Sequence, residues 1–513
     1  MTDKQEVERT PTLEQPGPWV MEDVTMVTLT EEDDRHIRRK TDIHLLIMLT
    51  WIYFLQVFDK AVFGTAALFN LRQDTGLTGA QYSLVASISS IAQLSWQPFS
   101  AWLIVKVPHR ILMPSLVLGW GIAEACIAAA RNFPELLVAR FFLGLFEAGC
   151  IPLFTIITGQ WYRRAEQPLR VSAWYSMNGL ATMAASAVSY GLGHIDSELL
   201  RPWQIIFLFA GLLTILSAPL VYWKLDNGVT SARFLSEQER LQAVKRLSTN
   251  QTGIGSSKFR WAQAAEVAIE PKSWLWVIMA VLPNLGSALT SFFGPIIIAG
   301  LGFDKYEASL LNIPFGAMQT LVIAGACWVS YNMKMKGVAL LGFMLPVVVG
   351  IAMLYGLDRS TSSRPALLAA YYLLAFLFAG NPLLLSWVVG NTAGTTKKSV
   401  TLSLYQAGLS AGGIAGPFMF KADQAPVYRS GVLGVLAIFI ALIACIVLQL
   451  GILTWLNKQQ RKKRIQNSKS ADVVDQSMQK KLHAFDGIEE QRLEASAFAD
   501  ITDRHNDEFV YIY

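Results

Sequence analysis

Twelve apolar runs of about 20 residues, each long enough to cross a hydrocarbon core about 30 Å thick, divide this 513-residue chain. A run of that length is twice what a transmembrane strand needs, and only a helix satisfies its backbone within one such segment. Only 16% of the residues are charged, whereas a soluble chain carries about 25%. The sequence therefore predicts an all-α membrane protein with twelve transmembrane helices, at residues 44–66, 80–105, 111–130, 135–159, 170–193, 203–224, 274–298, 308–332, 338–357, 365–389, 399–420 and 430–456.

A long charged segment separates the first six runs from the last six. Two six-helix halves with a substrate site between them are a common plan of secondary transporters. In the connecting segment, Ser236 and Glu239 have the spacing of a helix capping box, which predicts a short linker helix. We therefore divide the chain into an N-terminal tail (1–42), an N-terminal six-helix bundle (43–224), a linker (225–272), a C-terminal six-helix bundle (273–456) and a C-terminal tail (457–513).

The basic residues are concentrated on one side of the predicted membrane. Because Lys and Arg accumulate in cytoplasmic loops, this bias places both tails and the linker in the cytoplasm. The N-terminal 40 residues are polar and hold no short apolar core, so no cleavable signal peptide is expected. The basic residues that set this orientation are Arg38, Arg39, Lys40, Lys106, Arg110, Arg163, Arg164, Arg170, Arg461, Lys462, Lys463 and Arg464.

Four ionisable residues interrupt the first and fourth apolar runs: Asp59, Lys60, Arg140 and Glu147. An unpaired charge in a span costs at least about 2.5 kcal/mol, so such residues usually serve a function. Arg140 and Glu147 are almost two helical turns apart, so they share a face but are separated by about 10 Å. Each needs a partner from another helix, and Asp59 and Lys60 are the predicted partners. The expected site is a network of two acids and two bases.

Such a network can couple proton movement to anion movement. Arg140 keeps its charge, whereas a buried carboxylate can gain a proton and thereby release its basic partner to an anionic substrate. We assign Asp59 and Glu147 to the proton, and Lys60 and Arg140 to the carboxylate of the substrate. The alternative is a permanent ion pair that holds two helices together, but the cost of desolvating the two charges leaves such a pair with little net contribution to stability.

Other polar residues within the spans are less distinctive. Glu124 in the third run is a weaker candidate for the same site. The second half carries no charge at mid-depth, and its polar residues can orient a ligand by hydrogen bonds or simply join helices. The candidates from this half are Asn284, Asn381 and Ser386.

Motifs for other protein classes are missing from the sequence. The six His residues show no HxxxH spacing, and there is no CxxC pair and no phosphate loop of the GxxxxGK type. All four Cys residues fall within predicted spans, so no extracellular disulfide framework is available. We therefore expect no enzyme activity, no cofactor, no bound metal and no nucleic-acid partner. The expected partners are a small anionic substrate, protons and the lipid bilayer, and the protein is expected to be a monomer.

The residues around the buried charges resemble a known family. Residues 140–152 (RFFLGLFEAGCIP) are similar to the fourth-helix signature of the anion:cation symporter family, which belongs to the major facilitator superfamily. The Asp59–Lys60 pair is similar to an Asp-Arg pair in the first helix of the same family. Its fungal allantoate permease branch is the most similar. Further segments that resemble the family are residues 161–170, 312–316, 391–400, 425–428 and 500–509.

The resemblance implies the major facilitator fold, with a central cavity lined by the first, fourth, seventh and tenth helices, in the plasma membrane. It also implies that the first-helix acid and the fourth-helix Glu carry protons while the basic residues bind substrate. Asn391 and Lys397, within one of the similar segments, are weaker site candidates. Lys60 departs from the family by replacing the more common Arg, so it offers a point charge without a bidentate fork.

Three functions fit the sequence. The favoured one is proton-coupled uptake, by alternating access, of a small carboxylate such as a vitamin, a ureide acid, an amino acid derivative or a short peptide. The second is export of a secondary metabolite, although residues 181–193 lack the Gly-Pro-rich motif common in export antiporters. The third is a nutrient sensor that binds without transporting, for which the long C-terminal tail is the only feature.

Overall fold

The computed structural model describes residues 30–163, 166–195, 197–248, 260–333, 335–358, 361–421, 424, 427–467, 501–506 and 509–513. Parts of the two predicted tails, of the predicted linker and of the segments that resemble the family lie outside these ranges. Within them the chain is helical and contains no strand.

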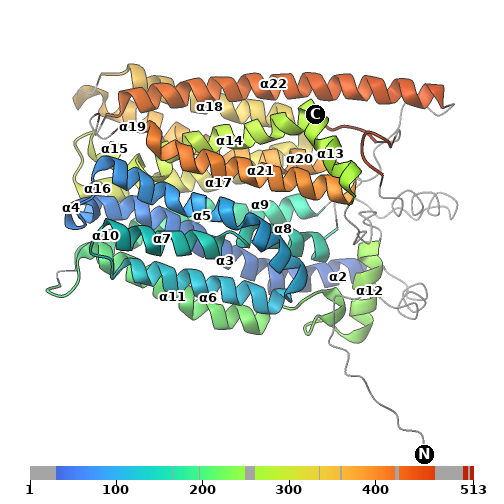
Figure 1. Ribbon diagram of the computed structural model, residues 1–513, viewed down its shortest axis with the longest axis horizontal. Coiled ribbons are helices and arrows are strands. Elements are labelled where there is room, and N and C mark those ends of the chain that lie inside the picture. The colour runs from blue at the N-terminus through green and yellow to red at the C-terminus, as the bar shows by residue number, and fades with distance from the viewer. Residues whose placement is uncertain are drawn as a thin grey trace, which may run out of the picture.

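The long helices run side by side along the long axis of the molecule (Figure 1). In the described part of the chain, nine helical segments are long and apolar enough to cross a membrane. The three other predicted spans are also helical, although one of them is broken into two helices. Together they give twelve spans in two sets of six, which confirms the predicted all-α fold.

The N-terminal half begins with a helical rod of three segments, α2 (Glu31–Thr41), η1 (Asp42–Leu46) and α3 (Ile47–Ala66), of which α3 is the first span. The fourth span is interrupted at Ala148–Gly149, where α7 ends and α8 begins. The other elements of this half are η2 (Ala67–Phe69), α4 (Leu71–Asp74), α5 (Gly79–Lys106), α6 (His109–Ile127), α7 (Phe133–Glu147), α8 (Cys150–Trp161), α9 (Gln167–Tyr175), α10 (Met177–Leu192) and α11 (Pro202–Lys224).

The C-terminal half repeats the six-span plan with more interruptions. Its last helix continues to Gln466, beyond the predicted end of the twelfth span at residue 456. The apolar run ends earlier than the helix because the final turns of the helix are polar. Its elements are α14 (Pro271–Ser291), α15 (Gly294–Ala299), α16 (Lys305–Leu310), α17 (Asn312–Met333), α18 (Lys336–Gly356), η4 (Thr361–Ser363), α19 (Arg364–Leu373), η5 (Leu374–Ala379), α20 (Gly380–Gly390), α21 (Thr395–Ala415), η6 (Gly416–Met419) and α22 (Arg429–Gln466).

The described linker contains η3 (Val229–Ser231), α12 (Glu237–Ser248) and α13 (Trp261–Ile269). The predicted capping box is confirmed, since Glu239 N donates to Ser236 Oγ at 3.3 Å and Ser236 N donates to Glu239 Oε2 at 2.8 Å. The helices α2, α12 and α13 gather at one end of the bundle, on the right in Figure 1. We call this end the linker face, and the opposite end, with α4, α15 and α16, the distal face.

The two halves contact each other along two pairs of helices, α5 with α21 and α10 with α17. Ser87 Oγ donates to the Ile414 carbonyl at 2.8 Å. On the other pair, Gly179 lies so close to α17 that an added Cβ would be 2.1 Å from the carbonyl oxygen of Gly316. Only glycine permits this approach of two backbones. These contacts bring the remaining inward faces of the halves, including α3 and α14, next to each other.

Candidate functional site

Asp59 lies on α3 and points into the interior of the N-terminal half, where it is 1% exposed. The indole N–H of Trp120, on α6, donates to Asp59 Oδ2. Asp59 Oδ1 has no hydrogen-bond partner among the described residues. The acid of the first span is therefore held by a neutral donor, and the predicted network is not a closed ring of ion pairs.

Lys60 and Glu147 make the ion pair that joins the first and fourth spans. Lys60 Nζ lies 3.5 Å from Glu147 Oε2, and Gln93 Nε2, from α5, donates to the same oxygen at 2.8 Å. The Glu147 side chain is 0% exposed, whereas that of Lys60 is 41% exposed. A buried carboxylate is thus paired with a lysine whose other side remains accessible.

Gly144 explains how Gln93 reaches this pair. An added Cβ at Gly144 would lie 2.3 Å from the carbonyl oxygen of Ser89, so α7 packs against α5 at backbone distance. Gln93 is one turn beyond Ser89, and Glu147 is almost one turn beyond Gly144. The close packing of the two backbones therefore positions the Gln93 amide beside the Glu147 carboxylate.

Arg140 is buried without an acidic partner among the described residues. It is 2% exposed, and its Cζ lies 4.1 Å from the centroid of the Phe63 ring, an attractive arrangement for a cation. It forms no ion pair within 4.0 Å with any described residue, and its Nε has no hydrogen-bond partner there. A guanidinium in this position can bind an incoming carboxylate.

Glu124, the weaker candidate of the third span, lies one turn beyond Trp120 on α6. It is 0% exposed, and neither of its carboxylate oxygens has a partner among the described residues. Asp59, Arg140 and Glu147 all act on it electrostatically. The structure thus places five buried or half-buried ionisable side chains in one region of the N-terminal half.

In the C-terminal half, two of the three predicted polar residues come together. Asn284 Nδ2, on α14, lies 3.5 Å from Asn381 Oδ1, on α20, and also donates to the Ala280 carbonyl at 3.1 Å. Asn381 in turn interacts with the side chain of Tyr175, on α9 of the other half. Ser386 Oγ instead donates to the Leu383 carbonyl of its own helix at 2.9 Å.

Three residues of this region carried no signal in the sequence. Gln93 lies in a run with several Ser and Gln residues, so its polarity does not stand out. Trp120 and Tyr175 are aromatic residues in spans, where packing is the usual role. Only the fold shows that Gln93 donates to Glu147, that Trp120 donates to Asp59 and that Tyr175 reaches across to Asn381.

Asn391 and Lys397 lie elsewhere, at the linker face. Asn391 Nδ2 donates to the Ile512 carbonyl at 3.0 Å. Lys397 is 0% exposed, and its Nζ lies 2.7 Å from Glu270 Oε1 and 2.9 Å from Asp503 Oδ1. These two residues therefore contact the end of the linker and the described C-terminal segment, and they are not part of the central group.

The described C-terminal segment, residues 501–506 and 509–513, packs on the linker face of the C-terminal half. Trp387 Nε1 donates to the Ile512 carbonyl at 2.8 Å, and Tyr511 OH donates to Asp503 Oδ2 at 2.9 Å. Asp503 also pairs with Lys272. Burial opposes ionisation of Asp503, but the charges of Lys272 and Lys397 outweigh it and lower the pKa of this carboxyl below its ordinary value.

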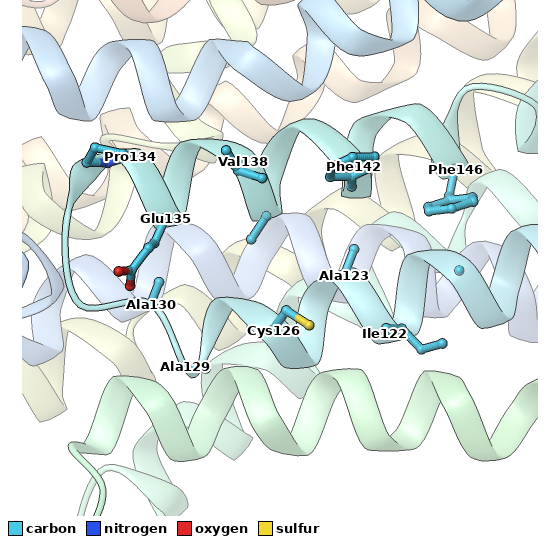
Figure 2. Close-up of a pocket in the computed structure, with 12 residues that line it drawn as sticks. Ile122, Ala123, Cys126, Ala129, Ala130, Pro134, Glu135, Val138, Phe142 and Phe146 are labelled. Carbon is cyan, nitrogen blue, oxygen red and sulfur yellow. The ribbon is translucent and has the colours of Figure 1, made fainter.

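An apolar groove of about 590 Å³ lies on the outer side of the N-terminal half, between α6 and α7 (Figure 2). Its wall includes exposed apolar side chains such as Ile122, Val138 and Phe142. Among the described residues that line it, Glu135 is the only charged one, and its carboxylate already accepts hydrogen bonds from Arg131 N and Asn132 Nδ2, both at 2.8 Å. This groove is largely apolar and lies apart from the group of buried charges, so it is not the candidate site.

Comparisons with known proteins agree with this fold. A sequence profile described as Major Facilitator Superfamily matches residues 49–417. An uncharacterised transporter of Schizosaccharomyces pombe is 30% identical, over 88% of this chain and 88% of its own length. A thiamine pathway transporter and an allantoate permease, both of Saccharomyces cerevisiae, are each 28% identical. Those alignments cover 93% of this chain and 86% of the first protein, and 96% of this chain and 88% of the second.

Among solved structures, a bacterial homologue of the human lysosomal transporter Spinster, in an inward-facing and occupied conformation, has a similar fold. The TM-score is 0.59 at 14% identity, over 79% of this chain and 96% of that one. The fold and the relatives define a multi-pass membrane transporter. The chain belongs to the major facilitator superfamily, and its relatives agree with the fungal permease branch that the sequence resembles.

Proposed function

We propose that the protein is a proton-coupled symporter that takes up a small organic anion by alternating access. The observation that carries this proposal is the pairing of Lys60 with Glu147 at 3.5 Å beside an Arg140 that has no acidic partner among the described residues. A site with an exchangeable ion pair and an unpaired buried cation suits a substrate that brings its own negative charge.

In the proposed cycle, a proton binds to Glu147 and breaks its pairing with Lys60. Lys60 and Arg140 then share the carboxylate of the substrate, and Asp59 carries a further proton. Charge balance makes the two events mutually dependent, because a cation within a membrane span that is released from its acid needs another anion. Departure of the substrate restores the Lys60–Glu147 pair and returns the empty carrier.

The remaining parts of the substrate would meet the C-terminal half. Asn284, Asn381 and Ser386 are proposed to hydrogen-bond its polar groups, and Asn284 and Asn381 already lie close together. The similarity to an allantoate permease supports a ureide acid as the first compound to test. We place the protein in the plasma membrane with the linker face in the cytoplasm, which the bias of basic residues toward that face supports.

The test is uptake of radiolabelled allantoate, and then of a panel of vitamins and short peptides, into proteoliposomes with an inward proton gradient. One pH unit supplies about 1.4 kcal/mol per proton, so each proton moved with the substrate should raise the accumulation ratio about tenfold. Glu147→Gln should abolish accumulation.

The matched control is Glu198→Gln, an exposed glutamate in the loop between α10 and α11. Normal accumulation by Glu147→Gln would refute the coupling proposed for Glu147. Anion transport in the outward direction only would favour an exporter. Binding without any transport would favour a sensor.

A further inference from the structure

Four aromatic side chains join the two halves on the distal side of the buried charges. Phe63, on α3, lies almost one helical turn beyond Lys60 toward the distal face. Its ring stacks on that of Tyr82, from α5, with centroids 5.4 Å apart, and meets the ring of Phe292 edge-on at 6.0 Å. Phe292 follows the last residue of α14, so this second contact crosses from the N-terminal to the C-terminal half. We call Phe63, Tyr82, Phe292 and Phe293 the distal aromatic cluster.

Close contacts hold the halves together at this cluster. Tyr82 OH donates to the Phe292 carbonyl at 3.3 Å, and the ring of Tyr82 meets that of Phe293 edge-on with centroids 5.9 Å apart. An added Cβ at Gly64 would lie 2.6 Å from the carbonyl oxygen of Ser291, so the two halves meet at backbone distance beside the rings. The structure therefore shows the halves closed against each other at the distal aromatic cluster.

Arg140 contacts one ring of the same cluster. Its Cζ lies 4.1 Å from the centroid of Phe63, and both side chains are at most 2% exposed. The attraction between a cation and a ring is strongest where water is excluded. A guanidinium that stacks on a ring also keeps its N–H groups, which lie in its own plane, for a carboxylate. Phe63 can thus hold Arg140 in place and leave it able to bind an anion.

We propose that Phe63 couples anion binding at Arg140 to closure of the distal face. The ring holds Arg140 while it packs in the distal aromatic cluster, and opening of the distal face withdraws it. Arg140 then binds an anion more tightly in the closed form, and because such coupling is reciprocal, a bound anion stabilises the closed form. A substrate that enters from the distal side favours closure behind it. This inference rests on the proposed symport and adds Phe63 to it as a positioning residue.

The closure can be measured without a ligand. Spin labels at Gln73→Cys, in α4, and Asp358→Cys, just beyond α18, report the separation of the halves at the distal face by double electron–electron resonance. Both positions are exposed, and the full chain is used with its four native Cys residues replaced by Ala. Substrate-free protein in lipid nanodiscs should show mainly the short distance of the closed form.

Two substitutions should open the distal face. Phe63→Leu removes the ring and Arg140→Gln removes the cation, and each should raise the ratio of open to closed protein at least about fivefold. The double variant should open no further than Phe63→Leu alone, because Arg140 acts through the ring. Phe63→Tyr keeps the ring and should remain closed. Phe58→Leu is the matched control, since Phe58 is a buried residue of α3 that stacks on Phe54, outside the cluster.

Allantoate tests the reciprocal effect. Added to the wild type, it should lower the ratio of open to closed protein, and Phe63→Leu should lose this response. In uptake assays, Phe63→Leu should raise the KM for allantoate at least about fivefold with a smaller change in maximal rate. Phe63→Tyr should restore the KM, which a loss of general packing would not explain.

Two outcomes would overturn the inference. One is an unchanged ratio in Arg140→Gln, because closure would then depend on aromatic packing alone. The other is a protein that transports allantoate but whose distal distance does not respond to it. If Arg140→Gln does not fold, Arg140→Lys replaces it, since it keeps the charge without the planar group and should also open the distal face. Failure of the symport proposal is seen separately, as unaffected allantoate uptake in Glu147→Gln, while the ligand-free distances still decide the role of Phe63.

Discussion

Lys397 and Asp503 form a fully buried ion pair, with Nζ 2.9 Å from Oδ1 and both side chains 0% exposed. Lys397 lies in the first turn of α21, the helix of the eleventh span, whereas Asp503 belongs to the described C-terminal segment. Glu266 and Glu270, at the end of the linker, contact the same lysine at 3.1 and 2.7 Å. One cation therefore ties together a span, the linker and the C-terminal segment.

Removing the acid from this cluster should destabilise the protein. Asp503→Ala leaves Lys272 without its nearest acid and removes one of the three acids around Lys397, and breaking a buried pair typically costs about 3–5 kcal/mol. We expect a lower thermal unfolding midpoint in detergent, read by intrinsic fluorescence. Lys458→Ala, at an exposed position on α22, is the control and should unfold like the wild type. Equal midpoints for Asp503→Ala and the control would show that the segment does not support the fold.

The same carboxyl predicts a pH dependence. Because the folded protein lowers the pKa of Asp503, the stabilisation is complete above the ordinary Asp value of about 3.9 and is lost as pH falls through the lowered value. The difference in unfolding midpoint between wild type and Asp503→Asn should thus be large at pH 7 and shrink below about pH 4. A difference that stays constant over this range would contradict the assigned role of the ionised Asp503.

Two glycines of the fourth span offer a matched comparison. Gly144→Ala places a Cβ against the Ser89 backbone, and overpacking of this kind costs about 1–3 kcal/mol. It should also separate Gln93 from Glu147 and reduce transport. Gly159→Ala meets no atom within 4 Å and should be neutral or stabilising by up to about 1 kcal/mol. Thermal unfolding and allantoate uptake check both variants, and equal behaviour would show that the close packing of α5 and α7 is unimportant.

Two substitutions of Lys60 distinguish the effect of its positive charge on uptake from the effect of its side-chain shape. Lys60→Arg keeps the cation beside Glu147, and the half-exposed side chain leaves room for the larger head group, so uptake should stay within about threefold of wild type. Lys60→Gln leaves Glu147 buried without its cation and should reduce uptake by at least about tenfold, or 1.4 kcal/mol in the barrier. Initial rates in proteoliposomes decide this. Equal rates for the glutamine variant would exclude Lys60 from the substrate site.

The sequence predicts the spans well because an apolar run of membrane length is a local property. It also predicts that a base of the first span meets Glu147, since an intramembrane charge needs a partner and few are available. The sequence does not predict that the helix of the fourth span is interrupted between Glu147 and Cys150, because Ala148 and Gly149 are residue types that are common within spans. The roles of the site residues in transport remain predictions.

The contacts of Asp503 show why contacts between distant parts of the chain cannot be predicted from the sequence. Asp503 and Lys397 are far apart in the chain, and each lies in a polar segment that resembles ordinary solvated sequence. Nothing local distinguishes an acid that is buried against Lys272 from one in water. The same holds for Trp120, whose indole N–H donates to Asp59 while the rest of the ring packs like any other aromatic side chain.

The packing of the C-terminal segment also decides how the protein can be handled. Tyr511 is 2% exposed, and Asn457 Nδ2 donates to both the Tyr511 carbonyl and Tyr513 OH at 2.8 Å. An affinity tag or fluorescent protein fused after Tyr513 would start at a residue held against α22, and its bulk would compete with those contacts. A reporter for localisation or purification should therefore not be fused directly after Tyr513, so that this surface stays intact.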